Sequence, residues 1–170
     1  AAAGLTSIDL WASDRVRPYN PSFQRAAELI QADWAKVGVT ANIITEEWTK
    51  YREDGKKKDR TGAFQIGWTG DNGDPDNFFA TLFSCSAIGV SNYSSWCDQD
   101  FEKAIQDAKT VSDPAERAKL YEKAQDIFAA QAPAFLLAHS QVYTVARKTV
   151  SGYLMDPLGI HRFDGVDKAE

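Results

Sequence analysis

The order of polar and apolar positions predicts a strand, a helix and a second strand in the first part of the chain. Polar and apolar side chains alternate over residues 7–11, as in a β-strand. An apolar spacing of three or four residues over 21–37 then predicts a helix with Asn20 as its cap. Gly38 ends this helix, and residues 39–45 form the second strand. The short exit turn indicates a βαβ unit with parallel strands. The predicted buried stripe of the helix comprises Phe23, Ala26, Ala27, Ile30, Trp34 and Val37.

A glycine-rich loop divides the chain after a third predicted strand. A short polar helix is expected over residues 47–55, and the third strand over 63–68. The loop that follows contains three glycines and leads into a short helix that we expect to be buried. The apolar positions of that helix are Phe78, Phe79, Leu82 and Phe83.

Two further helices have clear start signals. Asp98 or Asp100 caps the first, and Asp113 caps the second, in which Pro114 occupies the first position and Glu116 the third. Residues 134–138 and 142–147 are expected to be strands, followed by an irregular C-terminal arm. The sum is an α/β fold with a mainly parallel sheet flanked by helices. The core positions expected in the two helices are Phe101, Ala104, Ile105, Ala108, Leu120, Ala124, Ile127 and Phe128.

Composition restricts the class of protein. Lys and Arg number 19 against 24 Asp and Glu, so the net charge of -5 disfavours nucleic-acid binding. Apolar residues make up 44% of the 170 residues, which is enough for a packed core. No apolar run approaches the roughly 18 residues of a membrane-spanning helix. The abrupt start without Met or a leader pattern leads us to expect a piece of a longer protein.

Two cysteines lie twelve positions apart, on either side of an irregular segment rich in Ser and Gly. A zinc site lacks ligands at suitable spacing, since His139 and His161 are the two histidines of the chain. A disulfide between Cys85 and Cys97 is favoured over two free thiols. A structural disulfide indicates an oxidising compartment such as the periplasm.

Candidate chemistry falls after the first and third strands, at the edge where parallel sheets bind ligands. Residues 13–21 offer arginines and a tyrosine, whereas residues 67–77 offer aspartates, a tryptophan and glycines. Each feature alone has an ordinary structural explanation: paired arginines, tight turns at the glycines, and helix caps at Asp74 and Asp76. Together they place a cation and an anion at one edge, which suits a zwitterion with separated charges.

Three alternative sites do not fit the spacing. A phosphate loop requires glycines with Lys and Ser or Thr, whereas these glycines stand beside aspartates. A calcium loop counted from Asp71 has Asp76 where Gly is needed and Leu82 where Glu is needed. A cysteine hydrolase built on Cys85 and His139 lacks an oxyanion hole and a third member. We therefore predict no enzyme activity, no metal site and no cofactor.

Residues 67–79 (GWTGDNGDPDNFF) closely resemble the peptide/nickel family of extracytoplasmic solute-binding proteins, and within it the periplasmic dipeptide-binding proteins of ABC importers. Thirteen consecutive positions of this kind make the match specific. The likeness covers nearly the whole chain and includes residues 17–21, 30–39, 92–97, 131–134 and 156–159.

The resemblance implies a type II periplasmic-binding-protein (Venus-flytrap) fold, in which two hinged lobes close on a ligand. It assigns residues 1–140 to the C-terminal ligand-binding lobe and residues 141–170 to a tail that returns to the first lobe. Members of the family are considerably longer than this chain. Cys85 and Cys97 match the disulfide loop of the family.

The resemblance also assigns a role to each candidate residue. Asp71 would bind the α-ammonium of a peptide and Arg17 its carboxylate. Tyr19 and Trp68 would line the pocket between them. Backbone groups near Gly67 would hydrogen-bond the extended peptide as an added strand does.

We therefore predict the solute-binding component of a bacterial ABC peptide importer, located in the periplasm. Its partners would be a dipeptide or short peptide, the membrane permease and the missing N-terminal lobe. The chain alone is expected to bind peptide on the order of millimolar or worse, because exposed ion pairs yield only about 0–1 kcal/mol. Two alternatives remain: another ligand of the family (haem, glutathione or aminolevulinate), or an isolated lobe that forms a homodimer through its cut face or docks the permease.

Overall fold

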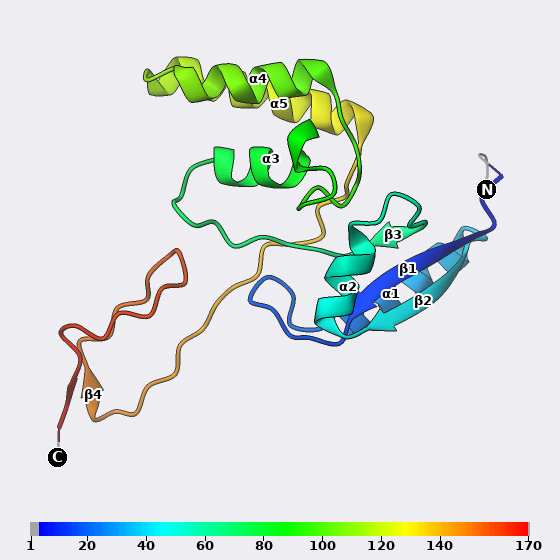
Figure 1. The fold of residues 1–170 in the computed structure, drawn as a ribbon. Helices are drawn as coiled ribbons and strands as arrows, with labels where there is room; N and C mark the ends of the chain where they lie inside the picture. Colours follow the sequence, from blue (N-terminus) through cyan, green and yellow to red (C-terminus); the bar gives the residue numbers. More distant parts are fainter. Residues whose placement is uncertain (1–3, 170) are drawn as a thin grey trace.

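The computed structural model describes residues 4–169 and contains a small sheet, a group of helices and an extended C-terminal segment (Figure 1). The elements are β1 (Ser7–Ser13), α1 (Phe23–Lys36), β2 (Thr40–Glu46), α2 (Trp48–Gly55), β3 (Ala63–Phe64), α3 (Asp76–Phe83), the 3-10 turn η1 (Cys85–Ala87), α4 (Gln99–Thr110), α5 (Pro114–Gln131), β4 (Val150–Ser151) and β5 (Asp167–Lys168).

The predicted βαβ unit is confirmed. The strands are parallel in the order β2-β1-β3, with Leu10 opposite both Ile43 and Ala63. The third strand is much shorter than the predicted 63–68, because the chain leaves the ladder after Phe64. There the side-chain Nε2 of Gln65 donates to the backbone carbonyl of Trp11 at 3.2 Å. The bond to β1 at this point therefore comes from a side chain and not from the backbone of β3.

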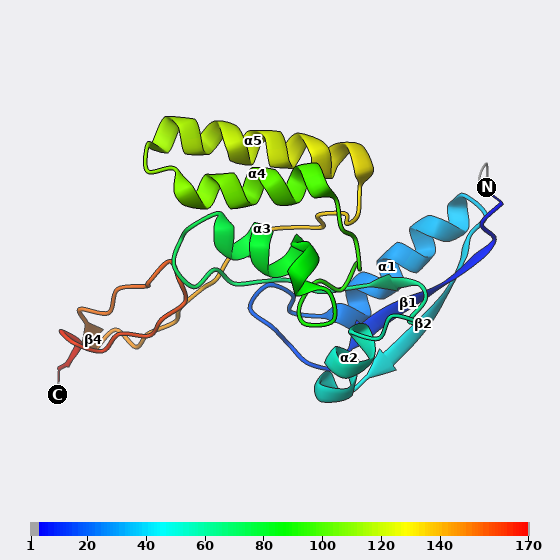
Figure 2. The same cartoon turned by 45° about the horizontal axis from the view of Figure 1, so that its top comes forward.

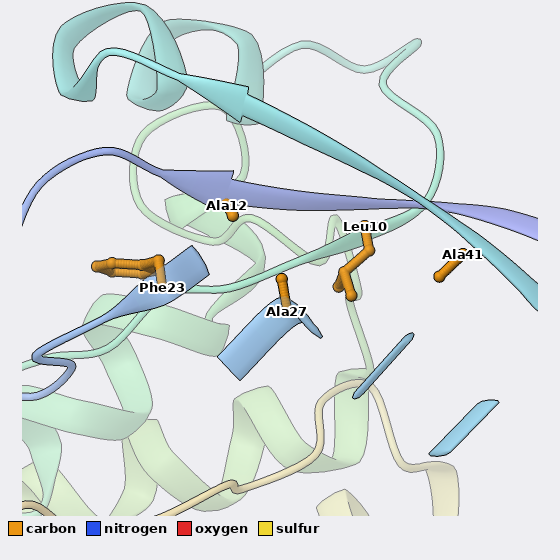
Figure 3. Close-up of a cluster of buried hydrophobic side chains, with 5 residues drawn as sticks. All are labelled: Leu10, Ala12, Phe23, Ala27 and Ala41. Atoms are coloured by element: carbon orange, nitrogen blue, oxygen red, sulfur yellow. The ribbon is translucent and has the colours of Figure 1, made fainter. Parts of the chain in front are cut away.

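Helix α1 packs on the sheet through small side chains. Leu10 and Ala12 from β1 and Ala41 from β2 meet Phe23 and Ala27 from α1, and all five are almost fully buried (Figure 3). The alanines allow the helix axis to approach the strands closely, so each side-chain volume is constrained.

The ends of α1 differ from the prediction in two details. Asn20 is not the cap, because its backbone pairs with Arg17 across a tight turn through two hydrogen bonds of 3.0 Å. Ser22 takes the cap position and accepts from the amide of Arg25 at 3.2 Å. Val37, expected in the buried stripe, is 60% exposed because the helix has already ended at Lys36.

The second core lies among α3, α4 and α5, which Figure 2 shows on the other side of α1 from β2. Asp98 and Asp113 cap α4 and α5 as predicted, each accepting from a backbone amide three residues on. Helix α3 is only partly buried, since Phe78 is 40% exposed. Tyr121, absent from the predicted core, is buried on α5. The buried residues common to this core are Phe101, Ala104, Ile105 and Ala124.

The strands predicted over 134–138 and 142–147 are wrong. Both segments are irregular and run away from the helices in an extended path (Figures 1 and 2). No strand of the described residues pairs with them, and Val145 is 96% exposed. The C-terminal segment instead forms a short antiparallel pair between β4 and β5. Within the described residues, no helix has both the length and the apolar character needed to cross a membrane.

The disulfide between Cys85 and Cys97 is confirmed. It joins η1 to the start of α4 and closes the loop around Asn92, a buried residue whose amide donates to the carbonyls of Ser84 and Trp96. The bridge and the amide thus hold the same loop from two sides.

Replacing both cysteines (Cys85→Ala with Cys97→Ala) is expected to lower the free energy of unfolding by about 3 kcal/mol, because the unfolded chain gains the entropy of an open loop. Urea unfolding followed by circular dichroism measures the change. Wild-type protein in a reducing agent serves as the control and should match the double variant. Equal stability of the oxidised wild type and the double variant would contradict a stabilising role.

Candidate functional site

Arg17 lies in the loop after β1 with its charged group stacked on an aromatic ring. Its guanidinium carbon stands 3.7 Å from the ring centroid of Trp48, the first residue of α2. Its Nε is buried and has no hydrogen-bond partner among residues 4–169. Since stacking satisfies the face of a guanidinium and leaves its edge free, Arg17 can still bind an anion in the plane of the group.

Tyr19 connects the loop after β1 with the segment after β3. Its ring packs edge-on against Phe23, with 6.3 Å between centroids. Burial raises the pKa of the Tyr19 hydroxyl, and the nearby Arg17 cation opposes that shift. On the other side, a Cβ placed on Gly67 would lie 2.3 Å from Tyr19 Cδ2, so Gly67 is the residue that allows this contact.

Trp68 and Asp71 are held together by a residue that sequence reasoning did not select. Asn77 Oδ1 accepts from Trp68 Nε1 at 2.6 Å and from the amide of Asp71 at 3.0 Å. Asn77 Nδ2 donates to Asp71 Oδ2 at 3.1 Å. The available signal was an asparagine in the first turn of a helix after a glycine-rich loop, which by itself indicates only turn chemistry.

The other aspartates of this loop are engaged with the helices. Asp74 accepts two hydrogen bonds from Arg117 on α5, at 2.6 and 2.8 Å, and Asp76 lies 3.3 Å from Lys109 Nζ on α4. The Arg117 guanidinium holds the pKa of Asp74 below its usual value. Asp74 also accepts from the backbone amide of Asp76 at 2.8 Å, but the cap position of α3 is taken by Pro75, so Asp74 is not the cap. Asp76 is instead the first residue of α3.

Arg17 and Asp71 therefore stand as two separate charges. Among residues 4–169, neither is in an ion pair, whereas the neighbouring Arg15 pairs with Glu47 at 3.8 Å. The structure brings Tyr19 to Gly67, and Trp68 to Asp71, but it records no direct contact between Arg17 and Asp71.

The candidate residues lie outside two cavities of the structure. One cavity, of about 360 Å³, lies at the amino ends of the strands beside Ser7 and Asn42. A second, of about 330 Å³, lies in the C-terminal segment beside Tyr153 and His161. Neither includes the five predicted site residues.

Comparison with known proteins identifies the family. Residues 6–89 match the family described as bacterial extracellular solute-binding proteins, family 5 Middle. Over 94% of its length the chain is 55% identical to the dipeptide-binding protein of Escherichia coli strain K12. The chain belongs to the family 5 solute-binding proteins.

This family 5 chain spans about 30% of the length of that relative. It is also 42% identical, over 93% of its length, to haem-binding protein A of Haemophilus influenzae, of which it covers 29%. The solved structure of a dipeptide-binding protein from Pseudoalteromonas sp. SM9913 in complex with Met-Leu matches with a TM-score of 0.83 and 30% identity. That match covers 96% of this chain and 32% of the other. The predicted α/β fold of a periplasmic binding protein is thereby confirmed.

Gly67→Ala is expected to cost about 1–3 kcal/mol of stability, because the added Cβ displaces the ring of Tyr19 from a packed position. Urea unfolding measures the cost. In a Tyr19→Ala background the same substitution should cost clearly less, since the obstructing ring is gone. An equal cost in both backgrounds would show that the ring does not set the requirement for glycine.

Proposed function

We propose that this chain forms part of the solute-binding component of a bacterial ABC importer for dipeptides or short peptides. Residues 1–140 would form the C-terminal ligand-binding lobe, and the peptide would lie in the cleft between it and a second lobe outside this chain. The observation that carries the proposal is the 55% identity, over 94% of the chain, to a protein named for dipeptide binding. The role is recognition rather than catalysis, and the membrane permease would be its protein partner.

In the proposed site, Arg17 binds the carboxylate of the peptide. Its guanidinium stacks on Trp48 and makes no ion pair with any described residue, so a ligand carboxylate would meet no competing acid. A half-buried arginine with a free edge is suited to bidentate binding of a carboxylate. Arg15, two positions earlier, is exposed and already faces Glu47.

Asp71 binds the α-ammonium at the other end. Its side chain is exposed. One of its oxygens accepts the hydrogen bond from Asn77, while the other has no partner in the part of the chain that the structure describes. Trp68 and Tyr19 line the region between the two charges, and Gly67 brings the backbone close enough to hydrogen-bond an extended peptide. Recognition of two termini and a main chain leaves side chains loosely selected.

The C-terminal residues 141–170 form a tail that packs on the other lobe of the complete protein. Support comes from the apolar side chains that this segment leaves in solvent, since contiguous exposed apolar surface usually marks a contact region. The exposed apolar residues of the tail include Val142, Tyr143, Val145, Leu154 and Phe163. A periplasmic location is supported by the disulfide, which persists in oxidising compartments. The homodimer stays a prediction.

In the full-length gene product, Arg17→Ala and Asp71→Asn are each expected to weaken Ala-Ala binding by about 2–5 kcal/mol, because each leaves one end of the zwitterion without a partner. Isothermal titration calorimetry measures the affinity. Arg15→Ala and Asp126→Asn remove exposed charges of the same kind elsewhere and should change affinity by less than about 0.5 kcal/mol. Unchanged affinity in both anchor variants would refute the zwitterion site.

A haem ligand is the second candidate, because a relative at 42% identity is named for haem binding. The same full-length protein titrated with haemin separates the two. Tight haemin binding that persists in Arg17→Ala and Asp71→Asn, with no Ala-Ala binding, would favour haem.

Val145→Asp in the full-length protein is expected to lower the free energy of unfolding by about 2 kcal/mol or more, because the tail position would place a carboxylate in an apolar contact. The identical substitution in the 170-residue chain is the control and should change stability by about 0.5 kcal/mol at most, since Val145 is 96% exposed there. Chemical unfolding of both proteins gives the comparison. Equal small effects in the two proteins would contradict the packing of the tail.

A further inference from the structure

We propose that Asn77 is a positioning residue for the amino-end anchor of the peptide site, and this inference rests on the proposed function. Asn77 lies in the first turn of α3 and contacts two of the five proposed binding residues at once. One carboxamide thus sets the relative placement of the Trp68 ring and the Asp71 carboxylate.

The orientation of this amide follows from its partners. Trp68 Nε1 and the backbone nitrogen of Asp71 are both obligate donors, so the atom that faces them must be the amide oxygen of Asn77. Its two lone pairs are then both used. The nitrogen of Asn77 must point the other way, toward Asp71 Oδ2, which it reaches at 3.1 Å.

This arrangement prepares Asp71 for one incoming cation. Among residues 4–169, the hydrogen bond from Asn77 is the one recorded for the Asp71 carboxylate, and it occupies Oδ2. The second oxygen is left for an ammonium group. Without Asn77 the exposed carboxylate would sample several rotamers, and binding would have to order it at an entropic cost.

The support beneath Asn77 is itself fixed. The backbone N–H of Asn77 donates to the backbone carbonyl of Asp74 at 3.1 Å, and the carboxylate of Asp74 accepts from both Nη atoms of Arg117. The position of Asn77 therefore depends on α5 as well as on its own helix. The Asn77 carboxamide is therefore held in one position, from which it orients the exposed carboxylate of Asp71.

A double-mutant cycle in the full-length gene product tests the inference. Asn77→Ala is expected to weaken Ala-Ala binding about tenfold, the loss typical of one hydrogen bond to a charged group. In an Asp71→Asn background the same substitution should change affinity by less than about threefold, because the anchor through which Asn77 acts is already lost. Calorimetry gives the affinities, and circular dichroism confirms folding.

Two controls separate positioning from a general effect on the loop. Asn72→Ala is a matched control from the same loop. Within the described residues, the Asn72 side chain accepts only from the backbone N–H of Asp74, at 3.0 Å, within its own turn. This substitution should leave the affinity within about twofold of the wild type. In protein labelled with 15N-tryptophan, the Trp68 indole resonance, assigned by its loss in Trp68→Phe, should move upfield in Asn77→Ala. Asn77→Ser provides the same cycle should Asn77→Ala not fold.

The outcomes are distinguishable. Retained affinity in folded Asn77→Ala, with loss in Asp71→Asn, overturns the role of Asn77 and leaves the peptide site standing. The role of Asn77 is also overturned if the loss of affinity in the double variant equals the product of the two single losses, or if the Trp68 indole resonance does not move. Retained affinity in Asp71→Asn overturns the amino-end anchor and, with it, this inference.

Discussion

One buried side chain, that of Gln65, connects the elements that carry the candidate site. The side-chain Nε2 of Gln65 donates to the backbone carbonyls of Trp11 and Phe23, each at 3.2 Å, and the backbone carbonyl of Gln65 accepts from the Tyr51 hydroxyl. The end of β1, the start of α1, helix α2 and the exit of β3 therefore meet at one point. Leaving a buried polar group unpaired costs about 1–3 kcal/mol, so the loops after β1 and β3 cannot separate without breaking several such bonds.

The parts of the fold that depend on neighbouring residues in sequence could be predicted. Asp98 and Asp113 were recognisable as caps because the groups they satisfy lie three residues away. Strand extent was not predictable, since it depends on a partner that is distant in sequence: where β3 ends, the Gln65 side chain bonds to Trp11 of the neighbouring strand β1. Residues 134–138 have a strand-like sequence, but no described strand lies beside them, so propensity alone did not produce a ladder.

The candidate site was predictable in outline because parallel strands bring their following loops to one edge of the sheet. That rule, together with the family resemblance, selected Arg17 and Asp71. It could not reveal what supports each of them. Trp48, which stacks on the Arg17 guanidinium, belongs to α2, and no sequence motif links that helix with Arg17. Asn77 contacts Asp71 only because the glycine-rich loop folds back on itself.

The loop after β3 carries three aspartates that are neutralised unequally. Asp74 and Asp76 face cations on α5 and α4, whereas Asp71 faces none among the residues that the structure describes. Among the described residues, Asp71 therefore keeps an uncompensated negative charge, and Arg17 keeps a positive charge that no acid pairs. Fields of this kind speed the encounter with opposite charge and weaken with added salt. In kinetic terms, the ion pairs at Asp74 and Asp76 leave Asp71 as the carboxylate of this segment that would attract an approaching cation before any contact is made.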